Sequence, residues 1–94
     1  MNKERRKELL AIINRLQSIN LSDESEVDSV KCDLESVLCD EEGYMDNIPE
    51  NLQGGYRYAK AEEACDSLQC AIDMLEDDDI DINDVTTYIY NALM

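Results

Sequence analysis

Apolar residues recur at alternating spacings of three and four residues in the second half of the chain. This spacing places their side chains along one face of a helix for nearly three heptads. A stripe of this kind packs against another helix, and its alternation suits left-handed antiparallel contact. The sequence therefore predicts that this helix is one arm of a helical hairpin. The stripe consists of Tyr58, Ala61, Cys65, Leu68, Ile72 and Leu75.

Two more helices are predicted earlier in the chain. Residues 2–18 show helical spacing at Leu9, Ile12, Ile13 and Leu16. A second helix starts after an N-cap at Ser22 or Ser25 and runs to about Tyr44 or Met45. The break at residues 20–22 contains neither Gly nor Pro, so two separate helices and one bent rod both remain open. The stripe of the second helix consists of Val27, Val30, Leu34, Val37 and Leu38.

Residues 46–55 are predicted to form the loop that reverses the chain. They include the one Pro and two of the three Gly, and Pro49 disfavours helix at the preceding Ile48. Two apolar residues in this loop, Ile48 and Leu52, are expected to plug one end of the helical layer. The second and third helices should then pack antiparallel, with Val30, Leu34, Val37, Leu38, Ala61, Cys65, Leu68 and Ile72 buried between them.

A short last helix is predicted at about residues 83–93, with Asp81 or Asn83 as its cap. The acidic run at residues 76–79 opposes the negative end of the preceding helix and should end it. The β-branched and aromatic residues at 85–90 leave a strand as an alternative, but the chain offers no partner strand. The predicted fold is a single all-α domain, residues 1–94, built as an antiparallel helical hairpin or a small bundle of three to four helices.

Charge limits the kinds of partner the chain can have. The formal net charge is −15, whereas the first fifteen residues are positive because of Lys3, Arg5, Arg6, Lys7 and Arg15. A chain this acidic repels nucleic acid and anionic membrane surfaces. It attracts strongly basic surfaces, and this attraction speeds association. We therefore expect a protein partner with a basic surface, and no direct contact with nucleic acid or membrane.

The four cysteines do not form a recognised motif. The N-terminus is charged from Lys3 to Glu8 and no apolar signal segment follows, so we expect a cytoplasmic protein with reduced thiols. The chain has no His and no closely spaced cysteine pair, so we expect no metal site. Three cysteines lie off the apolar stripes and indicate either a weaker second apolar face or plain surface thiols. These three are Cys32, Cys39 and Cys70.

No catalytic or cofactor motif is present. The run from Asp79 to Asn83 matches the first ligands of a calcium loop, but Asp84 stands where the loop requires Gly and Tyr90 where it requires Glu. Carboxylates are abundant, and nothing separates one pair from the others as an acid–base pair. The sequence therefore predicts a protein that is not an enzyme and carries no cofactor.

One segment resembles a known group of proteins. Residues 44–55 read Y-M-D-N-I-P-E-N-L-Q-G-G, and R-Y, E-E-A and A-I-D follow at 57–58, 62–64 and 71–73. With the N-terminal N-K-E-R-R-K-E-L, this pattern resembles small proteins carried by bacteriophages and integrated elements of gut-type bacteria. The resemblance implies a long helical hairpin and a mobile-element origin, and it implies no activity. The chain departs from the pattern at residues 18–27 and from Asp77 onward.

Our leading functional hypothesis is a phage-borne inhibitor that binds the basic groove of a host nucleic-acid-handling protein. Acids three or four residues apart on a helix lie about 5–6 Å apart, which is comparable with neighbouring phosphates. The second helix could thus act as a nucleic-acid mimic, as in an anti-CRISPR protein that binds a CRISPR effector. The candidate partner-binding residues are Asp33, Glu35, Asp40, Glu41, Glu42, Asp46 and Glu50.

The alternative is a structural or assembly adaptor, or a small regulatory protein, of a mobile element that acts as a homodimer. The distribution of the acids distinguishes the two hypotheses. A mimic gathers its acids on one surface, whereas an adaptor scatters them around a bundle that has an exposed apolar patch.

Overall fold

The computed structural model describes residues 2–93, and within them it contains four α-helices and no strand. This confirms the predicted all-α fold as a four-helix bundle, and the strand alternative at residues 85–90 is wrong. The helices are α1 (Lys3–Gln17), α2 (Glu24–Asp46), α3 (Tyr56–Leu75) and α4 (Ile82–Leu93), with a short 3₁₀ turn, η1 (Glu50–Leu52), between α2 and α3.

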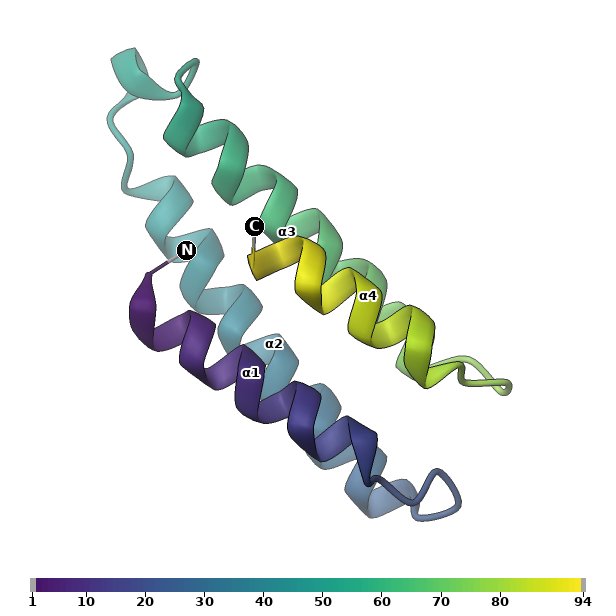
Figure 1. The fold of residues 1–94 in the computed structure, drawn as a ribbon. Coiled ribbons are helices and arrows are strands. Elements are labelled where there is room, and N and C mark those ends of the chain that lie inside the picture. The colour runs from purple at the N-terminus through teal and green to yellow at the C-terminus, as the bar shows by residue number, and fades with distance from the viewer. Residues whose placement is uncertain (1, 94) are drawn as a thin grey trace.

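Each helix runs antiparallel to the one before it, and α4 returns to lie against α1 as well as α3 (Figure 1). The long hairpin of α2 and α3 is therefore covered on one side by α1 and α4. Because α1 and α4 are shorter, the tip of the hairpin extends beyond them, and the molecule is elongated, at 47 × 23 × 19 Å. The opposite side of the α2–α3 hairpin faces outward.

The first two helices are separate. Asp23 is the N-cap of α2, since its carboxylate accepts hydrogen bonds from the backbone N–H groups of Ser25 and Glu26. The predicted caps, Ser22 and Ser25, are therefore wrong. The Asn20 side chain accepts from the N–H of Ser22 at 3.0 Å, so a local Asx turn reverses the chain without Gly or Pro.

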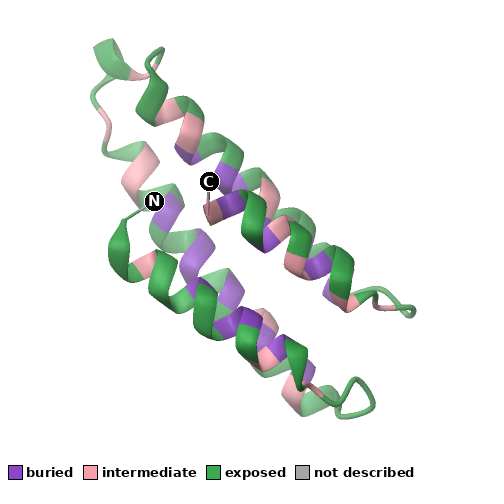
Figure 2. Ribbon diagram, viewed as in Figure 1, coloured by how far each residue is buried: buried purple, intermediate pink, exposed green. Residues whose placement is uncertain are grey.

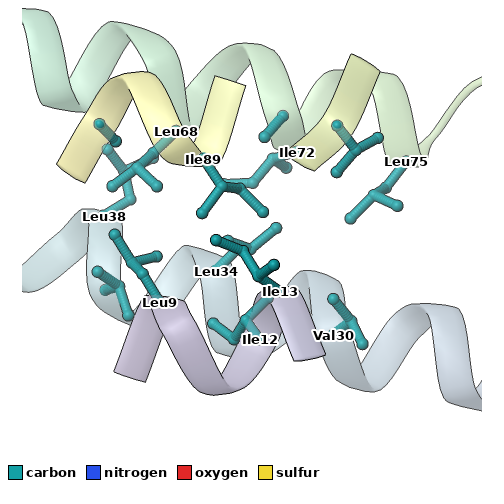
Figure 3. Packing of buried hydrophobic residues seen from close by; sticks show 14 of the residues in the cluster. Leu9, Ile12, Ile13, Val30, Leu34, Leu38, Leu68, Ile72, Leu75 and Ile89 are labelled. Atoms are coloured by element: carbon teal, nitrogen blue, oxygen red, sulfur yellow. The ribbon is translucent and has the colours of Figure 1, made fainter. Parts of the chain in front are cut away.

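The core is aliphatic and lies between the four helices (Figure 3). The eight residues predicted to be buried between α2 and α3 are all buried, as predicted, whereas Tyr58 at the start of the α3 stripe is only partly buried. Helices α1 and α4 add further buried residues to the same cluster. The most enclosed of these are Leu9, Ile13, Leu16, Val85 and Ile89.

The hairpin tip has no core of its own. No residue from 42 to 60 is buried, and this part of the molecule is exposed or partly exposed in Figure 2. Ile48 is half-buried, but Leu52 is 56% exposed. The expectation that Leu52 plugs one end of the layer is therefore wrong, because α1 and α4 stop short and leave no layer at the tip for it to close.

At the other end of the hairpin, α3 ends at Leu75, before the acidic run, as predicted. The Asp81 carboxylate accepts from the N–H groups of Asn83 and Asp84 and so caps α4. The three cysteines off the stripes are all exposed. They do not form a second apolar face against α1 or α4, which leaves a face for a second subunit or plain surface thiols as the alternatives.

Candidate partner-binding surfaces

The structure separates the seven acids that were grouped from the sequence. Glu35, Glu42 and Asp46 are exposed on the side of α2 that borders α3. Asp33 and Asp40 are exposed seven residues apart, hence on one face, and the Arg15 guanidinium of α1 contacts Asp33 there. Glu50 lies in η1 at the hairpin tip. The α2 acids therefore do not form one continuous row.

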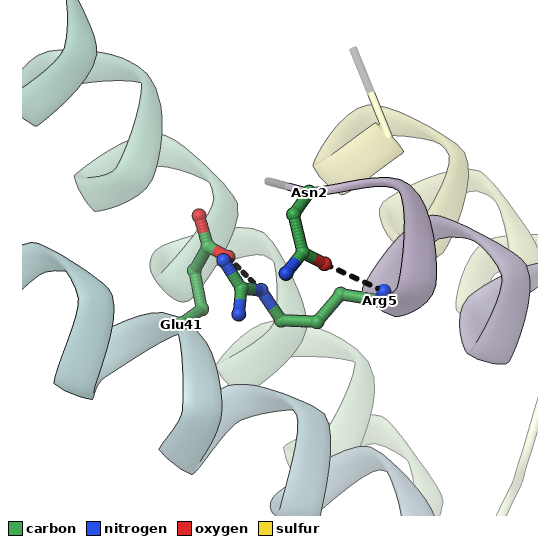
Figure 4. Close-up of polar contacts among 3 residues, drawn as sticks. All are labelled: Asn2, Arg5 and Glu41. Carbon is green, nitrogen blue, oxygen red and sulfur yellow. Dashed lines mark hydrogen bonds and ion pairs between the residues drawn. The ribbon is translucent and has the colours of Figure 1, made fainter.

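Glu41 is not on the surface at all. Its side chain is 0% exposed, and its Oε2 accepts a hydrogen bond from Arg5 Nε at 2.7 Å (Figure 4). A buried carboxylate paired in this way cannot meet a partner's basic groove. Its assignment as a partner-binding residue is therefore wrong, because the start of α1 covers this position of α2.

A different set of acids gathers along the outward face where α2 and α3 meet. On α2, Asp28, Glu35 and Glu42 are seven residues apart, so they lie almost in line. On α3, Asp66 and Asp73 repeat the same interval. With their exposed neighbours they form what we call the acidic seam, which consists of Glu24, Asp28, Glu35, Glu42, Asp46, Glu62, Asp66, Asp73 and Glu76.

Six of these acids line two hollows along the boundary between α2 and α3. Glu42 of α2 and Glu62 and Asp66 of α3 line the same hollow of about 230 Å³. Further along, Glu24, Asp28 and Glu76 line a second hollow of about 390 Å³. Lys31 lies there too, and its Nζ reaches Glu76 Oε1 across the helix boundary at 3.4 Å.

The Cys65 thiol reports the electrostatics of this seam. Its pKa is raised from 9.0 to about 11, first by burial and then by the charges of Glu41, Glu42, Asp66 and Asp46. The buried thiol is therefore neutral at ordinary pH. The carboxylates that act on it come from both α2 and α3, so negative charge is concentrated along the boundary between these helices.

The charge density of the seam is comparable with that of a nucleic-acid strand. Helix α2 is about 33 Å long at 1.5 Å per residue, and the seam carries nine carboxylates with Lys31 among them. This gives roughly one net charge per 4 Å, against 3.4 Å per phosphate in one strand of DNA. A basic groove shaped for a nucleic-acid strand would meet a similar linear density of negative charge.

Sequence reasoning missed six members of the seam: Glu24, Asp28, Glu62, Asp66, Asp73 and Glu76. The signal that could have found them is the seven-residue interval of acids beside the buried stripes. Grouping the acids of α2 only because the segment is rich in them combined residues that point toward α1, toward α3 and into the core. The seven-residue interval separates these three directions.

Positive charge gathers at the opposite side of the hairpin. A hollow of about 190 Å³ is lined by Arg6 of α1, by Tyr56, Arg57 and Lys60 of α3, by Tyr44 of α2, and by the end of α4. Lys60 Nζ lies 5.8 Å from the centre of the Tyr56 ring. We call this the basic hollow.

One cation of the basic hollow, Arg57, lies at an unfavourable position in its helix. Arg57 lies in the first turn of α3, which contains no acid, and Gly55 offers no capping side chain. The positive end of the helix dipole disfavours a cation there by about 0.3–1 kcal/mol. The hairpin therefore holds positive charge here at a local cost to helix stability.

A larger apolar hollow of about 490 Å³ adjoins the basic hollow at the hairpin tip. Tyr44, Tyr56 and Arg57 line both hollows. Ile48, Pro49 and Leu52 complete the apolar wall. Tyr56 is 76% exposed, so the tip presents apolar surface that the fold itself does not use.

Comparison of the chain with protein-family models, curated proteins and solved structures gives no match. No helix within residues 2–93 has the length and apolar character needed to cross a membrane. Within the same residues, no three His, Cys, Asp or Glu side chains are grouped so that they could hold a metal ion. The acidic seam and the basic hollow are the candidate binding surfaces.

Proposed function

We propose that this protein is a non-enzymatic interaction protein whose acidic seam binds a basic surface on a partner protein. The observation that supports the proposal is the gathering of exposed acids from α2 and α3 along the boundary between these helices, where six of them line two hollows. Such a surface attracts a basic partner at a distance and contacts it over the length of α2.

Solubility alone does not require this arrangement. Acids spread over all faces would keep the chain soluble without placing like charges on both sides of one helix boundary. In the seam, Glu42 and Asp66 line one hollow although they repel each other. Asp46 also ends α2 in a last turn that has no basic residue, where the helix dipole disfavours an acid. This concentration of charge weakens the fold, and a binding role gives a reason for it.

A narrower form of the proposal is an inhibitor that competes with nucleic acid for a basic groove. The linear charge density of the seam supports it, since the same lysines and arginines that bind phosphates would bind the seam. A CRISPR effector with its guide-binding channel is one partner of this class. The resemblance of residues 44–55 to phage-borne proteins favours a mobile-element origin and hence a host target.

The second candidate is an adaptor that acts as a homodimer. Leu52 and Tyr56 are both exposed and line one apolar hollow, so the hairpin tip offers a patch for a second copy. The two candidates differ in what holds the complex together. Salt weakens a contact made by the acidic seam, whereas it leaves an apolar contact in place or strengthens it.

The proposal is tested with two variants that each lose five negative charges. The seam variant carries Asp28→Asn, Glu35→Gln, Glu42→Gln, Asp66→Asn and Asp73→Asn. The off-seam variant carries Glu8→Gln, Asp40→Asn, Glu50→Gln, Glu63→Gln and Asp79→Asn, all at exposed positions. Wild type and both variants are immobilised and exposed to bacterial lysate at low salt. We expect wild type and the off-seam variant to retain a basic protein that the seam variant does not retain.

Equal retention by the two variants would contradict the proposal, because net charge would then be sufficient. Retention of the same protein by the seam variant alone would also contradict it. Circular dichroism of each variant serves as the folding control, and helix content should be unchanged because none of the ten positions is buried.

A further inference from the structure

The basic hollow and the apolar hollow adjoin, and together they form a groove that runs from α1 and the end of α4 onto the hairpin tip. Tyr44 from the end of α2 and Tyr56 and Arg57 from the start of α3 belong to both. One end of the groove is cationic, with Arg6 and Lys60, and the other is apolar, with Ile48, Pro49 and Leu52. The groove lies apart from the acidic seam, and no residue lines both.

Two of the four arginines in the chain line this groove, and both lack an acidic partner within the described residues. Arg5 pairs with Glu41 and Arg15 pairs with Asp33. No carboxylate among residues 2–93 forms an ion pair with Arg6 or Arg57. In a chain with a net charge of −15, acids are available on every helix, so two unpaired guanidinium groups that line one hollow are a specific feature.

The apolar end of the groove sets a second requirement for the ligand. Leu52 is 56% exposed and Tyr56 is 76% exposed, and both line the hollow of about 490 Å³. Covering these side chains removes apolar surface from water, which favours binding. A ligand that suits the whole groove therefore carries an apolar group next to a negative charge.

We propose that this groove binds a short peptide segment of a partner protein in which an apolar side chain stands beside a carboxylate. The carboxylate accepts hydrogen bonds from the Arg6 and Arg57 guanidinium groups, a geometry that arginine favours. The apolar side chain lies against Leu52 and the Tyr56 ring. The proposal does not depend on the acidic seam and stands if the proposed function fails.

A peptide fits the two hollows better than a free small anion. One carboxylate with a small body would fill only one of the two hollows. A peptide segment contacts both ends of the groove at once, and its second contact is made at high effective concentration.

The test uses the capped peptide acetyl-Ser-Asp-Leu-Leu-Asp-Ser-amide and amide-proton NMR of the full-length protein. Two control peptides replace both Asp by Asn or both Leu by Ser. We expect shift changes at Tyr44, Leu52, Tyr56 and Arg57, and binding by each control peptide that is about tenfold weaker, as loss of a charge-assisted contact predicts. Equal binding of all three peptides, or shifts that fall on the seam, would overturn the proposal.

Variants of neighbouring cations distinguish a direct contact in the groove from the effect of the protein's overall charge. Arg6→Gln and Arg57→Gln should each weaken binding about tenfold. Lys7→Gln removes the same charge from an exposed position that does not line the groove, and it should leave the dissociation constant nearly unchanged. An equal effect of Arg6→Gln and Lys7→Gln would show that only net charge matters and would overturn the proposal.

Two further outcomes identify other occupants. Hexanoate that binds as tightly as the peptide would make a small amphiphilic carboxylate the ligand and overturn the peptide assignment. Sedimentation that shows a dimer, which Leu52→Ser dissociates, would make a second copy of this chain the occupant and overturn it as well. A monomer that binds the peptide more tightly than hexanoate supports the proposal.

Discussion

Arg5 Nε donates a hydrogen bond to Glu41 Oε2 at 2.7 Å and so fastens the start of α1 to the last turns of α2. The Arg5 side chain is 13% exposed and that of Glu41 is fully buried. The Arg5 guanidinium also lies 5.5 Å from the centre of the Tyr44 ring. The pair thus supports Tyr44, which lines both hollows of the hairpin tip.

Replacing Glu41 with Ala should destabilise the protein by about 3–5 kcal/mol, because it leaves the Arg5 charge largely buried without its carboxylate. Urea denaturation measures the loss. The neighbouring Asp40→Ala, at an exposed position, should change the free energy of unfolding by less than about 0.5 kcal/mol. Similar losses for the two variants would show that the Arg5–Glu41 pair does not hold α1 in place.

The same pair can be replaced rather than broken. A double variant, Arg5→Met with Glu41→Leu, fills the position with apolar side chains and should be within about 2 kcal/mol of wild type or more stable. A double variant as unstable as Glu41→Ala would mean that the site is intolerant of any change. Comparison with the two single variants gives the coupling energy of the pair.

Two leucines that are equally apolar should differ sharply in their effect on stability. Leu68 is fully buried between the helices, whereas Leu52 is 56% exposed at the tip. Leu68→Ala should cost about 2–5 kcal/mol, and Leu52→Ala less than about 0.5 kcal/mol. Thermal and urea denaturation of both variants measure this difference, and a large loss for Leu52→Ala would contradict the placement of the tip.

The cysteines should fall into two classes of reactivity. Cys32, Cys39 and Cys70 are exposed and should react quickly with a thiol reagent at pH 8. Cys65 is 8% exposed and its pKa is raised to about 11, so it should react only when the protein unfolds. Four equally fast thiols would contradict the buried position of Cys65.

The raised pKa of Cys65 also predicts a dependence of stability on pH. A folded-state pKa above the unfolded value means that the fold favours the neutral thiol. This contribution is fully present below pH 9.0 and is lost as the pH rises through about 11. The difference in free energy of unfolding between wild type and Cys65→Ala should therefore shrink over that range. A constant difference would show that the thiol is not held in its neutral form.

Repulsion along the acidic seam should limit stability at low salt. The seam variant, with five of these acids neutralised, should melt at a higher temperature than wild type, and added salt should narrow the gap because it screens the repulsion. The off-seam variant is the control and should gain less. A seam variant that melts no higher than the off-seam variant would mean that the seam acids do not repel one another appreciably.

The helices and most of the core were predictable because helical spacing is a local property. The spacing of apolar residues from Ala61 to Leu75 identifies the buried face of α3 without any knowledge of the rest of the chain. The same logic places Val30, Leu34 and Val37 inward on α2. These positions agree with the structure because an amphipathic helix turns its apolar face toward the core, whichever helix it packs against.

The surface assignments failed where they depended on neighbouring helices. Glu41 is buried because Arg5, 36 residues away in the chain, meets it there. Leu52 is exposed because α1 and α4 end before the hairpin tip. Asp33 lies on the side of α2 that faces α1 and Glu35 on the side that borders α3, although they are two residues apart. Periodicity describes one helix and does not state which helix lies beside it.

The most direct test of the central claim is the dissociation constant of the retained partner at rising salt, measured for wild type and for the seam and off-seam variants. We expect the affinity of wild type and of the off-seam variant to fall steeply between about 0.1 M and 0.5 M salt, because many ion pairs are screened. The seam variant should bind weakly at every salt concentration. Tight binding by the seam variant at half-molar salt would contradict binding through the acidic seam, since the partner would then be held by contacts outside it.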